Sequence, residues 1–482
     1  MIILEDLTIN SSNNIKETLT KINNNSRGII FVTNNNQILV GVATDGDIRR
    51  ALIKGLNIED KISEAMNKNF IALNVEAEDK LIRKSFNSRI KIIPLCDTKG
   101  KLVDFADVQS NHRIPVLEPS LNGNELFYVE DCLKTNWISS QGSYVNKFEE
   151  IFKKLHCEMS SIAVSNGTCA LHLALLALSI GEGDEVIVPD ITFSATINSV
   201  IHCGAKPVIC DINPKTLCMD LDSIKRLISC NTKAIVPVHL YGQVCDMENI
   251  KKIAIDNDLF IIEDCAEALG SSIKNKPVGT FGDAATFSFF GNKTISTGEG
   301  GMVLFKNRKF AEKARIIRDH GMDPKKRYWQ LYVGHNYRMT NLQAAIGVAQ
   351  MEKFDDIVKK KIFIANRYNS LLSGIEGIET FPFTKSNTIN SYWLYTIILK
   401  KNISRDSLIK KLIEFGIDSR PVFYPLHEMP PYKKFTNKMN HFEFSDIAYS
   451  GISLPSSINL KKDEIMYICQ VLSNLLIDEK RF

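Results

Sequence analysis

The chain has 482 residues, of which 44% are hydrophobic and 24% charged, as expected for about two or three soluble domains. Its formal net charge of +4 is small for this length and argues against a basic surface that binds nucleic acid. Its eleven cysteines are scattered without a C-x-x-C pair, which excludes a disulfide framework and a structural zinc site. The acidic start "MIILEDLTIN" does not match a secretory signal and no apolar run is long enough to cross a bilayer, so we expect a cytoplasmic protein without membrane or metal partners.

The N-terminal part, residues 1–111, contains two copies of one pattern: strand, turn, strand and helix. The first copy is "RGIIFVTNNNQILVGVATDGDIRRAL", with a helix that opens near Asp47, and the shorter second copy is "RIKIIPLCDTKGKLVDFADVQ". The pair resembles a tandem CBS module, a regulatory α+β domain that often holds an adenine nucleotide in the loop before this helix. The resemblance implies that Thr44 and Asp47 contact the ribose, whereas the second copy lacks the T-D-G spacing before Asp107. A module that only packs or dimerises is the alternative.

A proline-containing stretch, "SNHRIPVLEPSLNG", marks the boundary that we place between residues 111 and 112. Beyond it, apolar strands such as "EVIVP", "LFIIEDC" and "GMVLF" alternate with helical stretches such as "CALHLALLAL". Near-continuous apolar strands separated by helices predict an α/β domain over residues 112–362, with a mostly parallel sheet covered on both faces. The alternation loosens over residues 363–482 and predicts a smaller α+β domain.

Polar groups follow several of these strands, at the sheet edge where ligands gather. In "AVSNGTCALHLALLAL" a strand and a helix flank Asn166–Cys169, so free N–H groups there suit a phosphate, although simple N-capping would look identical. Asp264 ends a buried strand and needs a cationic partner when ionised. Lys293, in "FSFFGNKTISTGEGG", follows an apolar strand that contains Ser288; a lysine that simply reaches solvent is the alternative. An amine, a carboxylate and a phosphate clamp match the needs of pyridoxal 5′-phosphate (PLP).

Four motifs, "SNGTCALHLALLAL", "IIEDCAEALGS", "FGDAATFSFFGNKTISTGEGGMV" and "GHNYRMTNLQAAIG", have the order and spacing found in DegT/StrS-type sugar-nucleotide aminotransferases. From Ile114 onward the chain resembles this family, which implies fold-type I architecture, PLP as cofactor and an obligate homodimer. Lys293 would carry PLP as a Schiff base and act as the catalytic acid and base, which argues against the dehydratase branch that has histidine there. The cofactor contacts that the resemblance implies are Asn166, Gly167, Thr168, Cys169 (through its backbone), Phe193 on the ring face, Asp264 at the ring nitrogen, Glu267 near the ring hydroxyl, Ser288, Lys293, and Asn336 from the partner subunit.

The finer resemblance, carried by stretches such as "RYWQLYVGHNYRMTNLQAA" and "RPVFYPLHEMPPY", is to GDP-perosamine synthases. It implies amination at C4 of GDP-4-keto-6-deoxy-D-mannose for O-antigen biosynthesis, with L-glutamate as the expected donor. The residues that border the sugar site in this family are Trp137, Ser139, Ser140, Tyr424 and His427. The alternatives are purely structural roles: Trp137 in the core, the two serines as helix caps and His427 as a surface histidine. Two alternatives stay open: a UDP-linked 4-keto-sugar aminotransferase of the bacillosamine or legionaminate type, and a nucleotide-sensing regulator with an aminotransferase scaffold.

Overall fold

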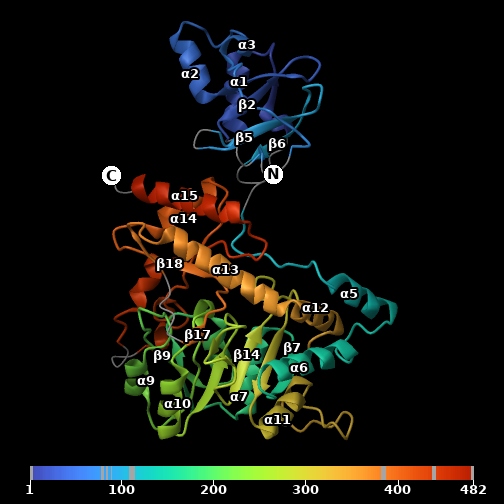
Figure 1. The fold of residues 1–482 in the computed structure, drawn as a ribbon, viewed down its shortest axis with the longest axis vertical. Helices are drawn as coiled ribbons and strands as arrows, with labels where there is room; N and C mark the ends of the chain where they lie inside the picture. The colour runs from blue at the N-terminus through green and yellow to red at the C-terminus, as the bar shows by residue number, and fades with distance from the viewer. Residues whose placement is uncertain are drawn as a thin grey trace. The chain divides into compact units, whose positions relative to one another are not determined.

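The computed structural model describes residues 4–25, 27–77, 81–82, 85–87, 90–107, 114–380, 387–436 and 441–478. The chain forms two compact units (Figure 1): unit 1 comprises Met1–Ile114 with Ile413–Gly416, and unit 2 comprises Pro115–Leu412 with Ile417–Phe482. The predicted boundary at residue 111 lies outside the described residues. The predicted boundary at residue 362 falls inside helix α13 (Phe354–Leu372), so unit 2 contains both parts of the predicted aminotransferase body.

Unit 1 is built from two similar three-stranded sheets. Their orders are β1-β2-β3 and β4-β5-β6, with β1 (Thr8–Asn10), β2 (Ile29–Thr33), β3 (Leu39–Thr44), β4 (Leu73–Asn74), β5 (Ile92–Cys96) and β6 (Leu102–Asp107). In both sheets the first strand is parallel to the second, and the second is antiparallel to the third. The helices described in full are α1 (Ile15–Asn25), α2 (Asp45–Ile53) and α3 (Ile62–Ala65).

The two hairpins of unit 1 are joined symmetrically. The Leu39 N–H donates to the Gly100 carbonyl and the Leu102 N–H donates to the Gln37 carbonyl. The offset that separates Leu39 from Leu102 also separates Gln37 from Gly100, so one repeat operation interconverts the two hydrogen bonds. This pairing agrees with a duplicated unit, while its assignment as a CBS module stays a prediction.

The centre of unit 2 is a seven-stranded sheet in the order β7-β15-β14-β11-β10-β8-β9. Its strands are β7 (Ser160–Val164), β8 (Glu185–Pro189), β9 (Lys206–Cys210), β10 (Thr232–Ile235), β11 (Phe260–Asp264), β14 (Ala284–Ser288) and β15 (Gly301–Phe305). Only β15 runs antiparallel to its neighbours, β14 and β7. The predicted, mostly parallel sheet is confirmed.

Helices cover both faces of this sheet, which explains why its strands are apolar throughout. On one face, Val164 and Val188 pack with helices α7 (Gly167–Ala177), α8 (Ala195–His202) and α11 (Arg308–Arg318). On the other face, Ala163 packs with α6 (Ser143–Leu155) and α12 (Asn341–Glu352), and Ile187 packs with α9 (Leu221–Leu227) and α10 (Met247–Asp256). Figure 1 labels α6, α7, α9, α10, α11 and α12 around the green and yellow strands.

The C-terminal part of unit 2 is a four-stranded antiparallel sheet in the order β16-β18-β20-β19, with α13 packed against α15. Further α-helices and strands are α5 (Glu125–Lys134), β12 (Ser272–Ile273), β13 (Lys276–Pro277), β16 (Ile378–Thr380), β17 (Thr388–Ile389), β18 (Tyr395–Leu399), α14 (Arg405–Glu414), β19 (Arg420–Pro421), β20 (Gly451–Leu454) and α15 (Lys462–Asp478). None of the helices in the described part of the chain combines the length and apolar composition needed to cross a membrane.

Candidate active site

Lys293 lies in the loop after β14, and only 13% of its side chain is exposed. Its Nζ is 3.5 Å from Glu267 Oε1 and 3.7 Å from the centroid of the Trp393 ring. The amine therefore has a carboxylate as one neighbour and an aromatic ring as another, and it does not extend into solvent.

Two buried carboxylates lie near this amine. Asp264 ends β11 and accepts hydrogen bonds from Thr196 Oγ1 at 2.9 Å and from the Ala266 N–H at 3.1 Å. Burial raises the pKa of the Asp264 carboxyl despite these donors and the charge of Lys293. Burial likewise raises the pKa of Glu267, whose Oε2 accepts the Tyr241 N–H at 3.0 Å. A further cation beside Asp264 would stabilise its ionised form, which fits a protonated ring nitrogen.

The start of α7 meets the end of β14, where Gly167 lies against Ser288. A Cβ on Gly167 would stand 2.8 Å from Ser288 Cβ and 3.1 Å from its Oγ, so only glycine permits this approach. Asn166 caps the helix, and its Oδ1 accepts the Cys169 N–H at 2.8 Å. A phosphate here would use the N–H groups of Gly167 and Thr168 and nearby hydroxyls first, since the Cys169 N–H already has an acceptor. These residues, with Lys293 and Asp264, fit PLP.

A row of aromatic rings connects Phe193 with Lys293. Phe193, half exposed after β8, lies 5.9 Å from Phe423, which stacks on Tyr241 at 5.5 Å, and Tyr241 stacks on Trp393 at 5.9 Å between ring centroids. Of these rings, sequence reasoning identified only Phe193. Tyr241 comes after β10 of the large sheet, and a position after a parallel strand is the sequence feature that could have indicated a place near the site.

Other predicted residues lie in different surroundings. Asn336 is exposed; its Oδ1 accepts a hydrogen bond from Arg338 Nε at 3.3 Å, and its backbone lies opposite Asp319 in an isolated antiparallel bridge. Trp137 and Ser139 accept hydrogen bonds through their carbonyl groups from Asn341 Nδ2 and N, at 2.7 and 3.0 Å.

Ser140, which directly follows Ser139, is half-buried.

In unit 1, Thr44 and Asp47 form a capping box at α2, and Asp47 Oδ1 also accepts a hydrogen bond from Arg50 Nη2 at 2.7 Å. The N-terminus of α2 is thus capped by residues of its own first turn.

The predicted sugar-site residue His427 is anchored by Asp190, a buried carboxylate just after β8. Asp190 accepts the His427 Nδ1 proton at 2.6 Å and its backbone N–H at 2.8 Å. The pKa of His427 is raised above its ordinary value. Burial alone would lower this pKa, but the hydrogen bond to Asp190 and the negative charge of Asp190 together have the larger effect. Tyr424, also predicted, accepts a hydrogen bond from Arg405 Nη2 at 2.9 Å through its hydroxyl.

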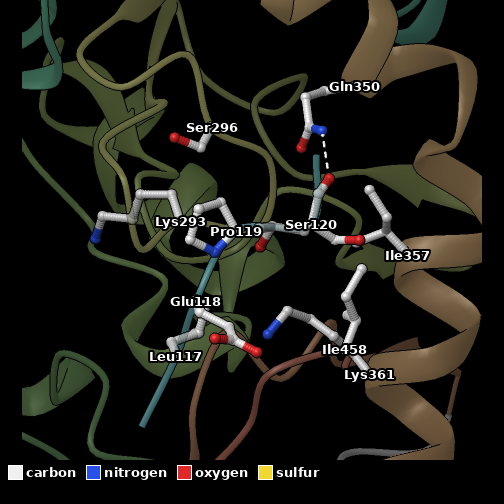
Figure 2. Close-up of a pocket in the computed structure, with 11 residues that line it drawn as sticks. Leu117, Glu118, Pro119, Ser120, Lys293, Ser296, Gln350, Ile357, Lys361 and Ile458 are labelled. Atoms are coloured by element: carbon white, nitrogen blue, oxygen red, sulfur yellow. Dashed lines mark hydrogen bonds between the residues drawn. The ribbon is translucent and has the colours of Figure 1, made fainter. Parts of the chain in front are cut away.

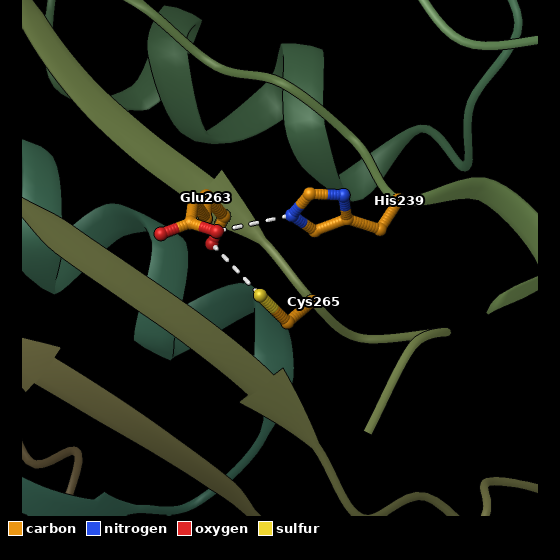
Figure 3. Close-up of side chains that lie close together, drawn as sticks. All are labelled: His239, Glu263 and Cys265. Carbon is orange, nitrogen blue, oxygen red and sulfur yellow. Dashed lines mark hydrogen bonds and ion pairs between the residues drawn. The ribbon is translucent and has the colours of Figure 1, made fainter. Parts of the chain in front are cut away.

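His239, Glu263 and Cys265 form a buried cluster beside Asp264 (Figure 3). The cluster has metal-ligand residue types, but its atoms are already hydrogen-bonded. Glu263 accepts three backbone N–H groups and His239 Nε2, and His239 Nδ1 accepts the Cys245 N–H. This network ties the loop over residues 279–282 to β11, so it supports the strand that carries Asp264.

Residues 119–473 match the family model described as the DegT/DnrJ/EryC1/StrS aminotransferase family. The chain belongs to this family. It is 44% identical to GDP-perosamine synthase of Vibrio cholerae over 75% of this chain and 98% of that protein. It is 45% identical to the protein of the same name from Caulobacter vibrioides, over 76% of this chain and 99% of the relative. Among solved structures it resembles the PLP form of Spr1654 from Streptococcus pneumoniae, with a TM-score of 0.72 and 27% identity over 76% of this chain and 99% of that one.

The predictions of a PLP-dependent sugar aminotransferase and of PLP as its cofactor are confirmed. The family match begins at residue 119 and so leaves unit 1 unexplained. The individual site roles, the sugar, the homodimer and the cytoplasmic location stay predictions.

Proposed function

We propose that this aminotransferase converts GDP-4-keto-6-deoxy-D-mannose to GDP-perosamine, with L-glutamate as amino donor, for surface polysaccharide of the O-antigen type. The observation that carries the proposal is the similarity to GDP-perosamine synthases, at 44–45% identity over nearly their whole length. Such a transfer needs an amine, a carboxylate and a phosphate site, and in this proposal Lys293, which is 13% exposed, Asp264 and the start of α7 supply them.

Each residue around the amine has a defined task in this proposal. Bound PLP supplies a ring that stabilises negative charge on the carbon that loses its proton. Lys293 would hold the cofactor covalently, and its released Nζ would carry the proton at the carbon where nitrogen is exchanged. Asp264 would keep the ring nitrogen protonated, because a cation relieves a buried carboxylate.

The remaining cofactor contacts would orient the ring. Asn166 would shape the start of α7, where Gly167, Thr168 and Cys169 together with Ser288 would hold the phosphate, Phe193 would stack on the ring, and Glu267 would face its hydroxyl. Around the sugar we place Trp137, Ser139, Ser140, Tyr424 and His427. Asp190 would keep the His427 ring in one orientation.

One experiment separates the substrate classes. Purified enzyme with glutamate is offered GDP- and UDP-linked 4-keto-6-deoxy sugars, and the products are identified by mass and NMR. We expect amination of the GDP-linked sugar at C4. Amination of only the UDP-linked sugar would instead support an enzyme of the bacillosamine or legionaminate type. Borohydride reduction in the presence of PLP should modify Lys293, and an unmodified Lys293 peptide would contradict the proposed catalytic role.

Unit 1 supports a second, regulatory proposal because its two sheets repeat one arrangement. We propose that it is a tandem CBS-type module that binds a nucleotide near Thr44 and Asp47. Binding would have to replace the contact between Asp47 and Arg50. AMP, ATP and GDP are each added to the full chain, and melting temperature, oligomeric state and turnover are measured. No change in any of the three would contradict regulation by these nucleotides.

A further inference from the structure

Trp393 holds the loop of Lys293 by two different contacts. Its indole Nε1 donates a hydrogen bond to the Asn292 carbonyl at 2.6 Å, directly before Lys293. Its ring face lies 3.7 Å from Lys293 Nζ, where an aromatic ring attracts an ammonium group. The indole is 5% exposed and stacks on Tyr241, so it has little freedom to move. Trp393 therefore fixes both the backbone of the loop and the position of the amine.

Lys361 in turn fixes the backbone of Trp393. It lies on α13, is 2% exposed, and its Nζ donates to the carbonyl groups of Trp393 at 3.0 Å and Ser456 at 3.1 Å. Both hydrogen bonds go to carbonyl oxygens, which provide acceptors for the buried amine without an acidic partner. The two hydrogen bonds join α13 to the segments that precede β18 and follow β20. An amine in such a place is costly to bury, so its position calls for a function.

A small pocket lies beside the Lys293 loop, and Figure 2 shows the side chains that line it. Its walls include Lys293, Ser296 and Lys361, together with residues 117–120, which follow unit 1 in the chain. The same connecting segment is held from the other side, because the Ser456 N–H donates to the Val116 carbonyl at 2.7 Å. The loop of Lys293 thus borders a pocket that it shares with residues 117–120 and Lys361, while Trp393 contacts the loop directly.

We propose that Trp393 is a positioning residue for Lys293 and that Lys361 sets the position of Trp393. The inference deepens the proposed function and rests on the role proposed for Lys293. The ring of Trp393 keeps Nζ facing the carboxylates, and the indole hydrogen bond keeps the loop from moving when the amine is free. Lys361 acts through Trp393 and touches neither cofactor nor substrate.

The test compares Trp393→Leu, Trp393→Phe and Lys361→Met with Lys360→Met, a matched change at the exposed neighbouring position on α13. The first readout is acetic anhydride labelling of Lys293 in the cofactor-free full chain, quantified by peptide mass spectrometry. In Trp393→Leu and Lys361→Met we expect labelling to rise by about two- to fivefold, the size of effect that a lost cation–π contact gives. Trp393→Phe keeps a ring face but loses the indole donor, so its labelling should lie between that of wild type and that of Trp393→Leu. Lys360→Met should leave labelling unchanged.

The second readout is PLP affinity, measured by visible absorbance. Because Trp393→Leu and Trp393→Phe both leave the Asn292 carbonyl without its donor, each should weaken PLP binding by about tenfold. Unchanged labelling and PLP affinity in Trp393→Leu and Lys361→Met would overturn the inference, as would equal increases at all buried lysines. If these two variants do not fold, Trp393→Phe decides, and unchanged PLP affinity in it overturns the inference. Borohydride trapping on wild-type Lys293 tests the proposed function separately, so the two failures are distinguishable.

Discussion

At the scale of single residues, the candidate site brings two buried carboxyl groups close to one largely buried amine. Asp264 and Glu267 are both nearly inaccessible, and Lys293 is the amine near them. Burial raises the pKa of both carboxyls, so neither is fully compensated by the protein alone. A buried carboxylate destabilises the free protein, and a bound cation would stabilise its ionised form. Such a group is characteristic of a binding site.

The first prediction concerns Asp264→Asn. Removing the carboxylate should lower turnover by about 10²–10³-fold, the usual effect of losing one preorganised electrostatic contact. The melting temperature of the cofactor-free protein should not fall, because the variant no longer buries a charge. Steady-state rates and thermal melts measure the two effects. Asp256→Asn, at an exposed position on α10, is the control, and an equal loss of turnover in that variant would contradict the assignment.

At the scale of elements, the site is assembled where strands end and helices begin. β11 ends at Asp264, β14 ends at Ser288, and α7 starts at Gly167. Because parallel strands end at the same edge, residues far apart in sequence come together without any special local structure. The support behind the Lys293 loop comes instead from α13 and the segment before β18.

The second prediction concerns the contact between α7 and β14. Gly167→Ala should weaken PLP binding by roughly tenfold or more, because the added Cβ moves the N–H donors of α7 away from the phosphate. Absorbance titration of the cofactor-free protein measures the affinity. Gly181→Ala is the matched control, since a Cβ there makes only ordinary contact at 3.5 Å. Equal affinity in Gly167→Ala and wild type would contradict the proposed phosphate site.

The third prediction is a pH dependence of stability due to Lys361. Burial lowers the pKa of Lys361 from 10.5 to about 7. Between these values the unfolded chain binds a proton that the folded chain does not, so stability rises with pH over this window and is lowest below pH 7. The free energy of unfolding of the wild type, minus that of Lys361→Met, should increase by roughly 2–4 kcal/mol from about pH 6.5 to about pH 9.5.

Urea unfolding at several pH values in that window measures this difference. Lys360→Met, at the exposed neighbouring position on α13, is the control, and a profile equal to that of Lys361→Met would contradict the prediction. A flat profile for Lys361→Met would mean that the amine stays charged inside the protein.

At the scale of the whole molecule, unit 2 exposes large apolar side chains that a single subunit leaves uncovered. Tyr328 and Val333, in the loop between α11 and α12, are 72% and 92% exposed, and Leu126 and Phe127 on α5 are 79% and 65% exposed. Exposed apolar side chains gathered on a few segments are typical of subunit interfaces. Asn336, predicted to reach the partner's phosphate, is in the same loop as Tyr328 and Val333, so its exposure is consistent with a homodimer.

The fourth prediction follows from this surface. Val333→Glu and Tyr328→Glu should weaken dimerisation by on the order of 100-fold, because each places a charge where an apolar side chain would be covered. Analytical ultracentrifugation measures the association, and activity should fall with it. Ile255→Glu removes an apolar side chain that is 69% exposed on α10 and should leave the association unchanged. A wild-type chain that is monomeric at micromolar concentration would contradict the homodimer.

Part of the candidate cofactor site could be predicted from short local patterns, whereas Phe193, Glu267 and Asn336 were predicted only from the family resemblance. Asn166–Cys169 lie between an apolar strand and a helix, Asp264 ends an apolar strand, and Lys293 follows one. Local periodicity sets where a strand stops, and the sheet then places those stops at one edge. The sequence alone could not decide whether the Cys169 N–H is available to a phosphate, because this depends on the side-chain conformation of Asn166. In the structure Asn166 Oδ1 accepts that N–H.

The amino-acid sequence by itself therefore determined the family, the cofactor, the order of elements in unit 2 and the residues at the strand ends. Only the tertiary structure decided that Trp393 lies against Lys293, that Lys361 holds Trp393, and that Asp190 anchors His427. Trp393 bonds to a carbonyl 101 positions away in the chain. No local pattern encodes such a partner, because long-range packing depends on how every intervening element folds back onto the others.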